Sequence, residues 1–476
     1  MVMKKQLVLL SLCLITITVS AQTNIGGVFI NNTTLTLANS PYRAINHILV
    51  PQGVTVLIEP GVIIYFNQGI FWQVDGELRA IGTAAQPIKF TKHSSATGWA
   101  GFWFTDLSVD YDSANGNGSV LSHCIIEYEG HFNLPNNQDA WSIWIIQCAP
   151  LISNCEIRNF YTGVLIYNSS ASAVNCSIHN GLYFPVGVYN HNNPLLAIVN
   201  HNIIYNINNP NGNDNAAITL WGGAQFIGNC IHDMGDSMAV RVASNNVEID
   251  SNNFINCRAA LAIYGGYDST LRITNNIFYN NSVNLLLTGC ERAPVISHNN
   301  FSNYIYYHIF VDGYYNVFGT YDCPLIITSY TMNLQNNYWG GLTSSQMDMA
   351  IWDYNDDFVT KVIADYSAAA MQPFNLPFQE GCNNLTYLQE QNLGEFFSVF
   401  PNPFTSFLSI TIPEQNINHL SITIKNIFGQ TVFSKQPETL NRKPETSFDL
   451  SFLPQGIYLV EVIADGERMV KKVVKQ

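Results

Sequence analysis

The chain has 476 residues, enough for two or three domains, and its 47% hydrophobic content with only 11% charged residues excludes a disordered chain. Its formal net charge of −14 at pH 7 gives an acidic surface that repels phosphate backbones and anionic lipids. We therefore expect no nucleic-acid partner and no partner at a membrane surface. Calcium ions or neutral polymers are more compatible partners for such an acidic surface.

Residues 1–21 have the order of a secretory signal peptide. Lys4 and Lys5 precede an apolar run from Leu7 to Val19, and small residues follow up to Ala21. The run is shorter than the ~20 apolar residues that a bilayer requires, so a transmembrane anchor is the weaker alternative. We expect cleavage after Ala21 and no transmembrane segment in the mature chain.

A short phrase recurs along the middle of the chain, as in NCEIRN at 154–159 and NNIFYN at 275–280. Such repetition is typical of a solenoid, in which each repeat buries its apolar face only by stacking on its neighbours. The central apolar residues of the repeat are Ile126, Ile157, Ile178, Ile204, Ile231, Phe254, Phe278, Phe301 and Tyr338.

The position two residues before each central residue changes from cysteine to asparagine once along the chain. Stacked asparagines at a bend can hydrogen-bond to one another and to the backbone. Because the cysteines are scattered singly, we interpret them as small buried ladder members and predict neither a disulfide framework nor a zinc site. The ladder comprises Cys124, Cys155, Cys176, Asn202, Asn229, Asn252, Asn276, Asn299 and Asn336.

Two residues after seven of the nine central residues the chain leaves the strand at an Asn or Asp, residue types that tolerate a left-handed turn. These turn residues are Asn159, Asn180, Asn206, Asp233, Asn256, Asn280 and Asn303. Short alternating strands follow and stack into one parallel sheet. Their outward column reads Trp103, Trp144, Leu165, Gly187, Thr219, Arg241, Ala262, Leu286 and Phe310.

The N-terminal coils at 53–66, 75–95 and 99–104 resemble the opening coils of bacterial surface proteins of the pectin-lyase-like superfamily, and NNYWGG at 336–341 resembles their far end. The resemblance implies an all-β fold with a right-handed parallel β-helix, which we assign to 22–369. It marks the fold and does not identify a function.

A Gln/Asn-rich stretch at 370–395 is predicted to be a linker, and 396–476 changes to closely spaced alternating strands. This segment resembles the type A sorting domain of the type IX secretion system, a small immunoglobulin-like β-sandwich. The residues that carry the resemblance are Pro401-Asn402-Pro403, Gly429-Gln430, Leu453–Tyr458, Lys471, Lys472 and Lys475. It implies a secreted or cell-surface protein that crosses the periplasm and meets the type IX machinery.

An enzyme of this fold would be a polysaccharide lyase, with a basic residue removing a sugar proton, or a glycoside hydrolase, with paired carboxylates. The best candidates are Arg241 as the base and Asp214, Asp233 or Asp236 as calcium ligands. Acidic loop residues are more often solvated. The histidines near the repeat, His123, His179, His201 and His232, are more typical of turn or ladder positions than of catalysts.

Exposed aromatic residues in register favour a different function, because sugar rings stack on a row of aromatic faces. We therefore expect a monomer that binds an extracellular polysaccharide or surface glycan without cleaving it. The alternatives are that loops cover these rings, or that the solenoid is a structural or adhesive rod. The predicted binding residues are Trp103, Trp144, Tyr167, Tyr189, Trp221 and Tyr264.

Overall fold

The computed structural model describes residues 22–130, 132, 141–190, 195–208, 216–235, 237–244, 246–264, 270–287, 294–311, 329–357, 360–378, 382, 398–411, 420–426, 431–435, 445–464 and 467–476. The predicted signal peptide lies outside them. The chain divides into two compact units, Met1–Leu385 and Thr386–Gln476. Among the described residues, no helix has the length and apolar character needed to cross a membrane.

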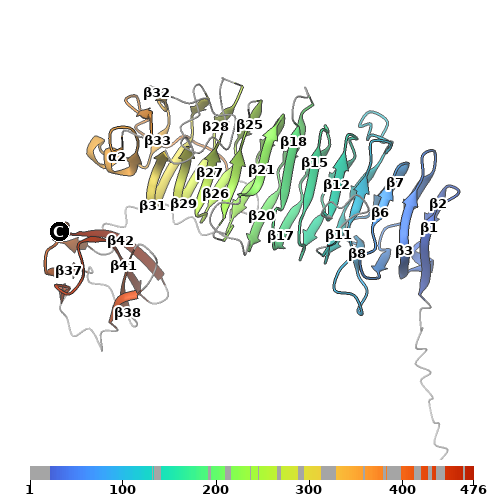
Figure 1. Ribbon diagram of the computed structural model, residues 1–476, viewed down its shortest axis with the longest axis horizontal. Helices are drawn as coiled ribbons and strands as arrows, with labels where there is room; N and C mark the ends of the chain where they lie inside the picture. The colour runs from blue at the N-terminus through green and yellow to red at the C-terminus, as the bar shows by residue number, and fades with distance from the viewer. Residues whose placement is uncertain are drawn as a thin grey trace, which may run out of the picture. The chain divides into compact units, whose positions relative to one another are not determined.

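The first unit is a right-handed parallel β-solenoid, as predicted, whose coils contribute strands to three parallel faces (Figure 1). We call these faces sheets 1, 2 and 3; sheets 1 and 3 are joined into one 22-stranded sheet, and sheet 2 is a separate 11-stranded sheet. Sheet 1 contains β6 (Trp72–Val74), β9 (Phe102–Phe104), β12 (Ile143–Ile146), β15 (Val164–Tyr167), β18 (Val186–Asn190), β21 (Ala216–Gly222), β24 (Met238–Val242), β27 (Ala259–Ile263) and β34 (Ile351–Trp352). Sheet 2 contains β2 (Thr33–Leu35), β4 (Thr55–Ile58), β7 (Glu77–Ile81), β10 (Val120–Ser122), β13 (Leu151–Ser153), β16 (Ser172–Val174), β19 (Ala197–Asn200), β22 (Ala224–Ile227), β25 (Val247–Asp250), β28 (Arg272–Thr274) and β30 (Val295–Ser297).

Sheet 3 follows sheet 2 in every coil, and some strands run on from sheet 3 into sheet 1 without a break. It contains β5 (Ile63–Phe66), β8 (Ile88–Lys92), β11 (Cys124–Glu127), β14 (Glu156–Arg158), β17 (Ser177–Gly181), β20 (Ile203–Ile207), β23 (Cys230–His232), β26 (Asn253–Ile255) and β33 (Tyr338–Trp339). The continuous strands are β3 (Tyr42–Val50), which also pairs with β1 (Thr23–Val28), and β29 (Ile277–Leu287) and β31 (Asn300–Val311). Outside the three sheets, η1 (Leu37–Asn39) follows β2, and β32 (Tyr330–Asn333) pairs with β35 (Val362–Asp365).

The predicted central residues of the repeat form one inward ladder in sheet 3. The register runs from Ile126 through the later coils to Phe301, and the Phe278 and Phe301 rings stack at 4.6 Å between centroids. The last predicted member of this ladder, Tyr338, is wrong by one residue. Trp339 pairs with Phe301 and is buried, whereas Tyr338 is only partly buried, because the larger ring of the Tyr338-Trp339 pair fills the end of the core.

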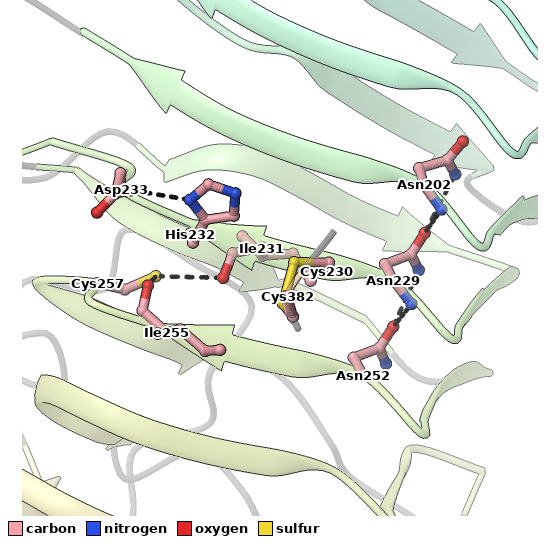
Figure 2. Close-up of a disulfide and its surroundings, with 10 residues drawn as sticks. All are labelled: Asn202, Asn229, Cys230, Ile231, His232, Asp233, Asn252, Ile255, Cys257 and Cys382. Carbon is pink, nitrogen blue, oxygen red and sulfur yellow. Dashed lines mark hydrogen bonds and ion pairs between the residues drawn. A yellow bond between two sulfur atoms is a disulfide. The ribbon is translucent and has the colours of Figure 1, made fainter. Parts of the chain in front are cut away.

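The predicted asparagine ladder lies at the bend between sheets 2 and 3 (Figure 2). Asn229 illustrates its geometry: the side-chain Oδ1 accepts from the Asn202 backbone N–H at 2.9 Å, and Nδ2 donates to the Val199 carbonyl at 2.9 Å. Cysteine thiols take the donor position in the earlier coils, as Cys155 does toward the Leu121 carbonyl at 3.4 Å. The final member is Asn337, and not Asn336 as predicted.

The turn row is confirmed, since every predicted member has a positive φ, between 46° and 56°. His123 and His201 adopt the same conformation at the bend before sheet 3. Near the C-terminal end of the solenoid, α2 (Ser344–Ala350) begins with a capping box between Thr343 and Gln346. The buried side chains of Met347 and Ala350 close that end of the core.

The second unit is built from two antiparallel sheets around a core of its own, consistent with the predicted β-sandwich. Gly429-Gln430 lies outside the described residues. The first sheet contains β36 (Ser398–Phe400), β37 (Phe407–Thr411) and β40 (Glu445–Asp449). The second contains β38 (Leu420–Asn426), β39 (Thr431–Lys435), β41 (Gly456–Ala464) and β42 (Glu467–Lys475).

Candidate functional site

The outward column of sheet 1 has the predicted register at every step from Trp103 to Phe310. A second outward column lies beside it, in which Tyr167 pairs with Tyr189 and Tyr189 pairs with Trp221. The rings of Tyr189 and Trp221 are 6.1 Å apart with an interplanar angle of 45°. Tyr167 is 41% exposed, and the other two side chains are partly exposed. We call Tyr167, Tyr189 and Trp221 the aromatic row.

The N-terminal part of the first column is covered. Trp103 and Trp144 stack on each other at 5.8 Å, and the side chains of Phe71, Phe132 and Trp141 pack around them. Trp144 is only 5% exposed as a result. The exposure expected for its ring is therefore not found, and Trp103 and Trp144 belong to a small secondary core.

Tyr264 is also buried, in a cluster with Met238 and Ala262. Its hydroxyl contacts the Met238 sulfur at 3.4 Å, and the Arg241 guanidinium lies 6.0 Å from its ring centre. The ring face of Tyr264 is thus engaged within the protein, so the exposure predicted for this residue is not found either.

Of the three acidic residues predicted to assist Arg241, the structure describes only Asp233. Arg241 donates to Thr219 Oγ1 at 3.4 Å, while Asp233 Oδ2 accepts from His232 Nδ1 at 2.8 Å at the bend after β23. This contact with His232 lowers the pKa of Asp233. Asp214 and Asp236 lie outside the described residues. No group of three His, Cys, Asp or Glu side chains suited to a metal ion occurs in the part of the chain that the structure describes.

Sheet 3 carries a buried ion-pair network that sequence reasoning missed. Glu127 accepts hydrogen bonds from Lys89 at 2.7 Å, Arg158 at 2.8 Å and Thr91 at 2.9 Å. Burial alone would raise the pKa of Glu127, but these donors outweigh it and lower the pKa. Thr91 and Arg158 lie opposite Glu127 on the two neighbouring strands, and Lys89 lies two residues before Thr91. The available signal was therefore the opposite charges that the repeat places at adjacent outward positions of β8, β11 and β14.

A stack of three rings continues along the same sheet. His179 and Tyr205 are 4.7 Å apart, Tyr205 and His232 are 4.9 Å apart, and the rings are nearly parallel. His179 also contacts Glu156 at 3.2 Å. The prediction that these histidines occupy ladder positions is confirmed.

A disulfide, which the scattered spacing of the cysteines did not indicate, joins Cys230 in β23 to Cys382 (Figure 2). Residues 370–378, which the sequence placed in a linker, lie along sheet 3 before this disulfide. Ala370 forms a bridge to Tyr338, and Phe374 exchanges two hydrogen bonds with the Asn300 side chain. We call 370–378 together with Cys382 the strap.

Each unit contains a match to a known family model. Residues 141–303 match the family model described as a right handed beta helix region. Residues 398–476 match that of the secretion system C-terminal sorting domain. The C-terminal unit is a type IX sorting domain. The protein is therefore a secreted or outer-surface β-helix protein exported by that system. A search of curated proteins finds no match to the chain.

Proposed function

We propose that the solenoid binds extracellular carbohydrate through the aromatic row and does not cleave it. The observation that carries this proposal is the register of Tyr167, Tyr189 and Trp221 on adjacent coils of sheet 1, where Tyr167 is 41% exposed and the other two side chains are partly exposed. Parallel strands repeat every ~4.8 Å, so consecutive rings present apolar faces along the solenoid axis. Amphipathic rings suit the C–H faces of sugars and leave hydroxyl groups in water.

Binding without cleavage is favoured by the chemistry beside the row. Arg241 is the one charged residue in the adjacent outward column, and Asp233 is engaged by His232. Hydrolases of sugars require two positioned carboxyl groups, and the described residues of the two columns supply no such pair. A lyase or hydrolase that uses loop residues is the second candidate, and an adhesive rod is the third.

The test uses the mature chain, 22–476, with a panel of neutral and acidic polysaccharides in the presence and absence of calcium. Bound protein and newly formed reducing or unsaturated ends are measured in the same tubes. We expect binding without products. The variant Tyr167→Ala with Trp221→Ala should bind about 5- to 150-fold more weakly, because two ring contacts of about 0.5–1.5 kcal/mol each are lost.

The matched control is Tyr65→Ala, which removes a partly exposed ring from sheet 3 and should leave binding unchanged. Unchanged binding by the double variant would reject the aromatic row. Release of products would favour the enzyme, and Arg241→Ala would then show whether that residue is required. Neither binding nor products from any polymer would favour the adhesive rod.

A further inference from the structure

Among the described residues of the outward column of sheet 1, Gly187 in β18 is the one glycine. It is buried although it faces outward, so side chains from other positions lie over it. A Cβ atom at this position would lie 3.0 Å from Tyr189 Cε2, 3.3 Å from Leu165 Cδ1 and 3.4 Å from Trp141 Cη2. The missing side chain therefore leaves room for two aromatic rings against the backbone of the sheet.

Trp141 comes from the segment before β12, so the strand pattern in the sequence did not place it beside the aromatic row. Its ring packs on the cluster of Trp144 and Leu165 and reaches as far as Gly187. The Phe184 ring lies 6.2 Å from the Trp141 ring at an interplanar angle of 30°. Both side chains are partly exposed. We call Trp141, Phe184 and the aromatic row together the aromatic surface.

The aromatic row gives this surface a direction. Its three members lie on adjacent coils, so their rings follow one another along the solenoid axis. Successive coils are ~4.8 Å apart, which is close to the length of one sugar unit in an extended chain. Such a chain places successive units over successive rings when it lies along the axis, whereas a coiled chain turns away from a flat sheet after a short contact.

The charges around the surface favour an uncharged ligand. The net charge of −14 repels acidic polymers at a distance. Arg241 is the one cation among the described residues of the outward column, and its guanidinium already contacts Thr219 Oγ1 at 3.4 Å and lies 6.0 Å from the centre of the Tyr264 ring. Uncharged sugars need no cation, because their C–H faces pack on aromatic rings while their hydroxyl groups stay in water.

We propose that the ligand is an uncharged polysaccharide with an extended, β-linked backbone, that it lies lengthwise on the aromatic surface, and that Gly187 positions the rings of Tyr189 and Trp141 beneath it. This inference rests on the proposed function and adds to it the class of ligand, a further binding residue and a positioning residue. A side chain at position 187 lifts both rings off the sheet, because the contacts of 3.0 and 3.4 Å leave no room for it.

The first measurement compares three classes of polysaccharide for binding to the mature chain, 22–476. Glucomannan and xylan are extended and uncharged, amylose and dextran are coiled and uncharged, and polygalacturonate and alginate are extended and acidic. We expect the first class to bind about ten-fold or more tightly than the other two. Equal or tighter binding of a coiled or an acidic chain would overturn this inference and would leave the aromatic row as a binding surface.

The variant Gly187→Val tests the positioning role. Branched residues favour strands, so the urea midpoint of unfolding should not fall. Binding to glucomannan should weaken about ten-fold, because the Tyr189 and Trp141 rings are displaced. The matched control, Ser172→Val, adds the same side chain at an outward position of sheet 2 and should bind as wild type does.

The role of Trp141 is tested separately, so that the inference can be judged even if Gly187→Val is unstable. Trp141→Ala should weaken binding to glucomannan about 2- to 13-fold, whereas Trp141→Phe keeps a ring and should retain most of the affinity. Binding at the wild-type level by Trp141→Ala, or by a stable Gly187→Val, would overturn the inference. Unchanged binding by Tyr167→Ala with Trp221→Ala would instead reject the proposed function, and a wild type that binds no polymer would reject both.

Discussion

The Asn229 carboxamide shows how a single residue holds two successive bends in place. It accepts from the Asn202 backbone and donates to the carbonyl of Val199, and all of these groups are buried. A thiol is a weaker donor and acceptor than a carboxamide. Cys176 Sγ donates to the Val174 carbonyl at 3.3 Å, and its own backbone N–H donates to Asn202 Oδ1 at 2.8 Å. The ladder therefore gains hydrogen bonds where cysteine changes to asparagine.

We predict that Asn229→Ala lowers the free energy of unfolding by about 2–5 kcal/mol, because it leaves a buried N–H and a buried carbonyl unpaired. Urea unfolding of the mature chain measures the loss. The control, Asn208→Ala, changes an exposed asparagine outside the ladder and should stay within about 0.5 kcal/mol of wild type. Equal losses in the two variants would contradict the role assigned to the ladder.

The buried side chain of His308 makes the stability of the folded protein depend on pH, and this effect is separate from that of the surface charge. Burial lowers the pKa of His308 to about 3, and its Nδ1 lies 2.7 Å from Asn284 Nδ2. The unfolded chain binds this proton near pH 6.5 and the folded chain does not, so the contribution to stability is complete above pH 6.5 and is lost as the pH falls toward 3. The loss is on the order of a few kcal/mol.

The variant His308→Gln removes this titration and keeps a polar side chain beside Asn284. Urea unfolding midpoints measured from pH 7 to pH 4 should decline less steeply in the variant than in wild type. If the unfolding midpoints of the two proteins decline equally between pH 7 and pH 4, the buried imidazole does not determine the loss of stability in this pH range.

At the scale of elements, the strap ties the last coils to earlier ones. It contacts β33 through Ala370 and β31 through Phe374, and it ends at β23 through the disulfide. Phe378 packs with Ile255 and Tyr279 between these points. The strap thus crosses sheet 3 against the direction in which the coils advance.

We expect Cys382→Ser to lower the free energy of unfolding by up to about 5 kcal/mol, because the disulfide closes a loop of 152 residues and restricts the unfolded chain. Unfolding with and without a reductant measures the effect. Wild type should lose stability on reduction, whereas the variant should not respond, since the other cysteines that the structure describes are free thiols. A wild type that is insensitive to reductant would refute this prediction.

At the scale of the whole molecule, the parts that repeat could be predicted from sequence. Residues at a fixed distance in sequence from the central residue of each repeat occupy equivalent places in the coils. Aligning the repeats therefore placed both the outward column from Trp103 to Phe310 and the left-handed turn row. The shift at Asn337 arose because Asn336-Asn337 and Tyr338-Trp339 offer two registers, and side-chain size selects between them.

The parts that do not repeat could not be predicted. Cys382 lies outside the coils, and no spacing in the sequence relates it to Cys230. The covering of Trp144 by Phe132 and Trp141 depends on residues before β12 that have no counterpart in other coils. The aromatic row was therefore found from sequence, but which of its neighbours are exposed depended on tertiary packing.

The strap also has a consequence for the number of coils. Each bend ladder joins only neighbouring coils, so gain or loss of one coil before β23 would change the length of the solenoid and leave every other contact intact. The same change between β23 and β33 would move Cys230 away from Cys382 by one coil step, ~4.8 Å, while the strap keeps its length. The strap therefore fixes the number of coils between β23 and β33. The number of coils before β23 remains free to vary.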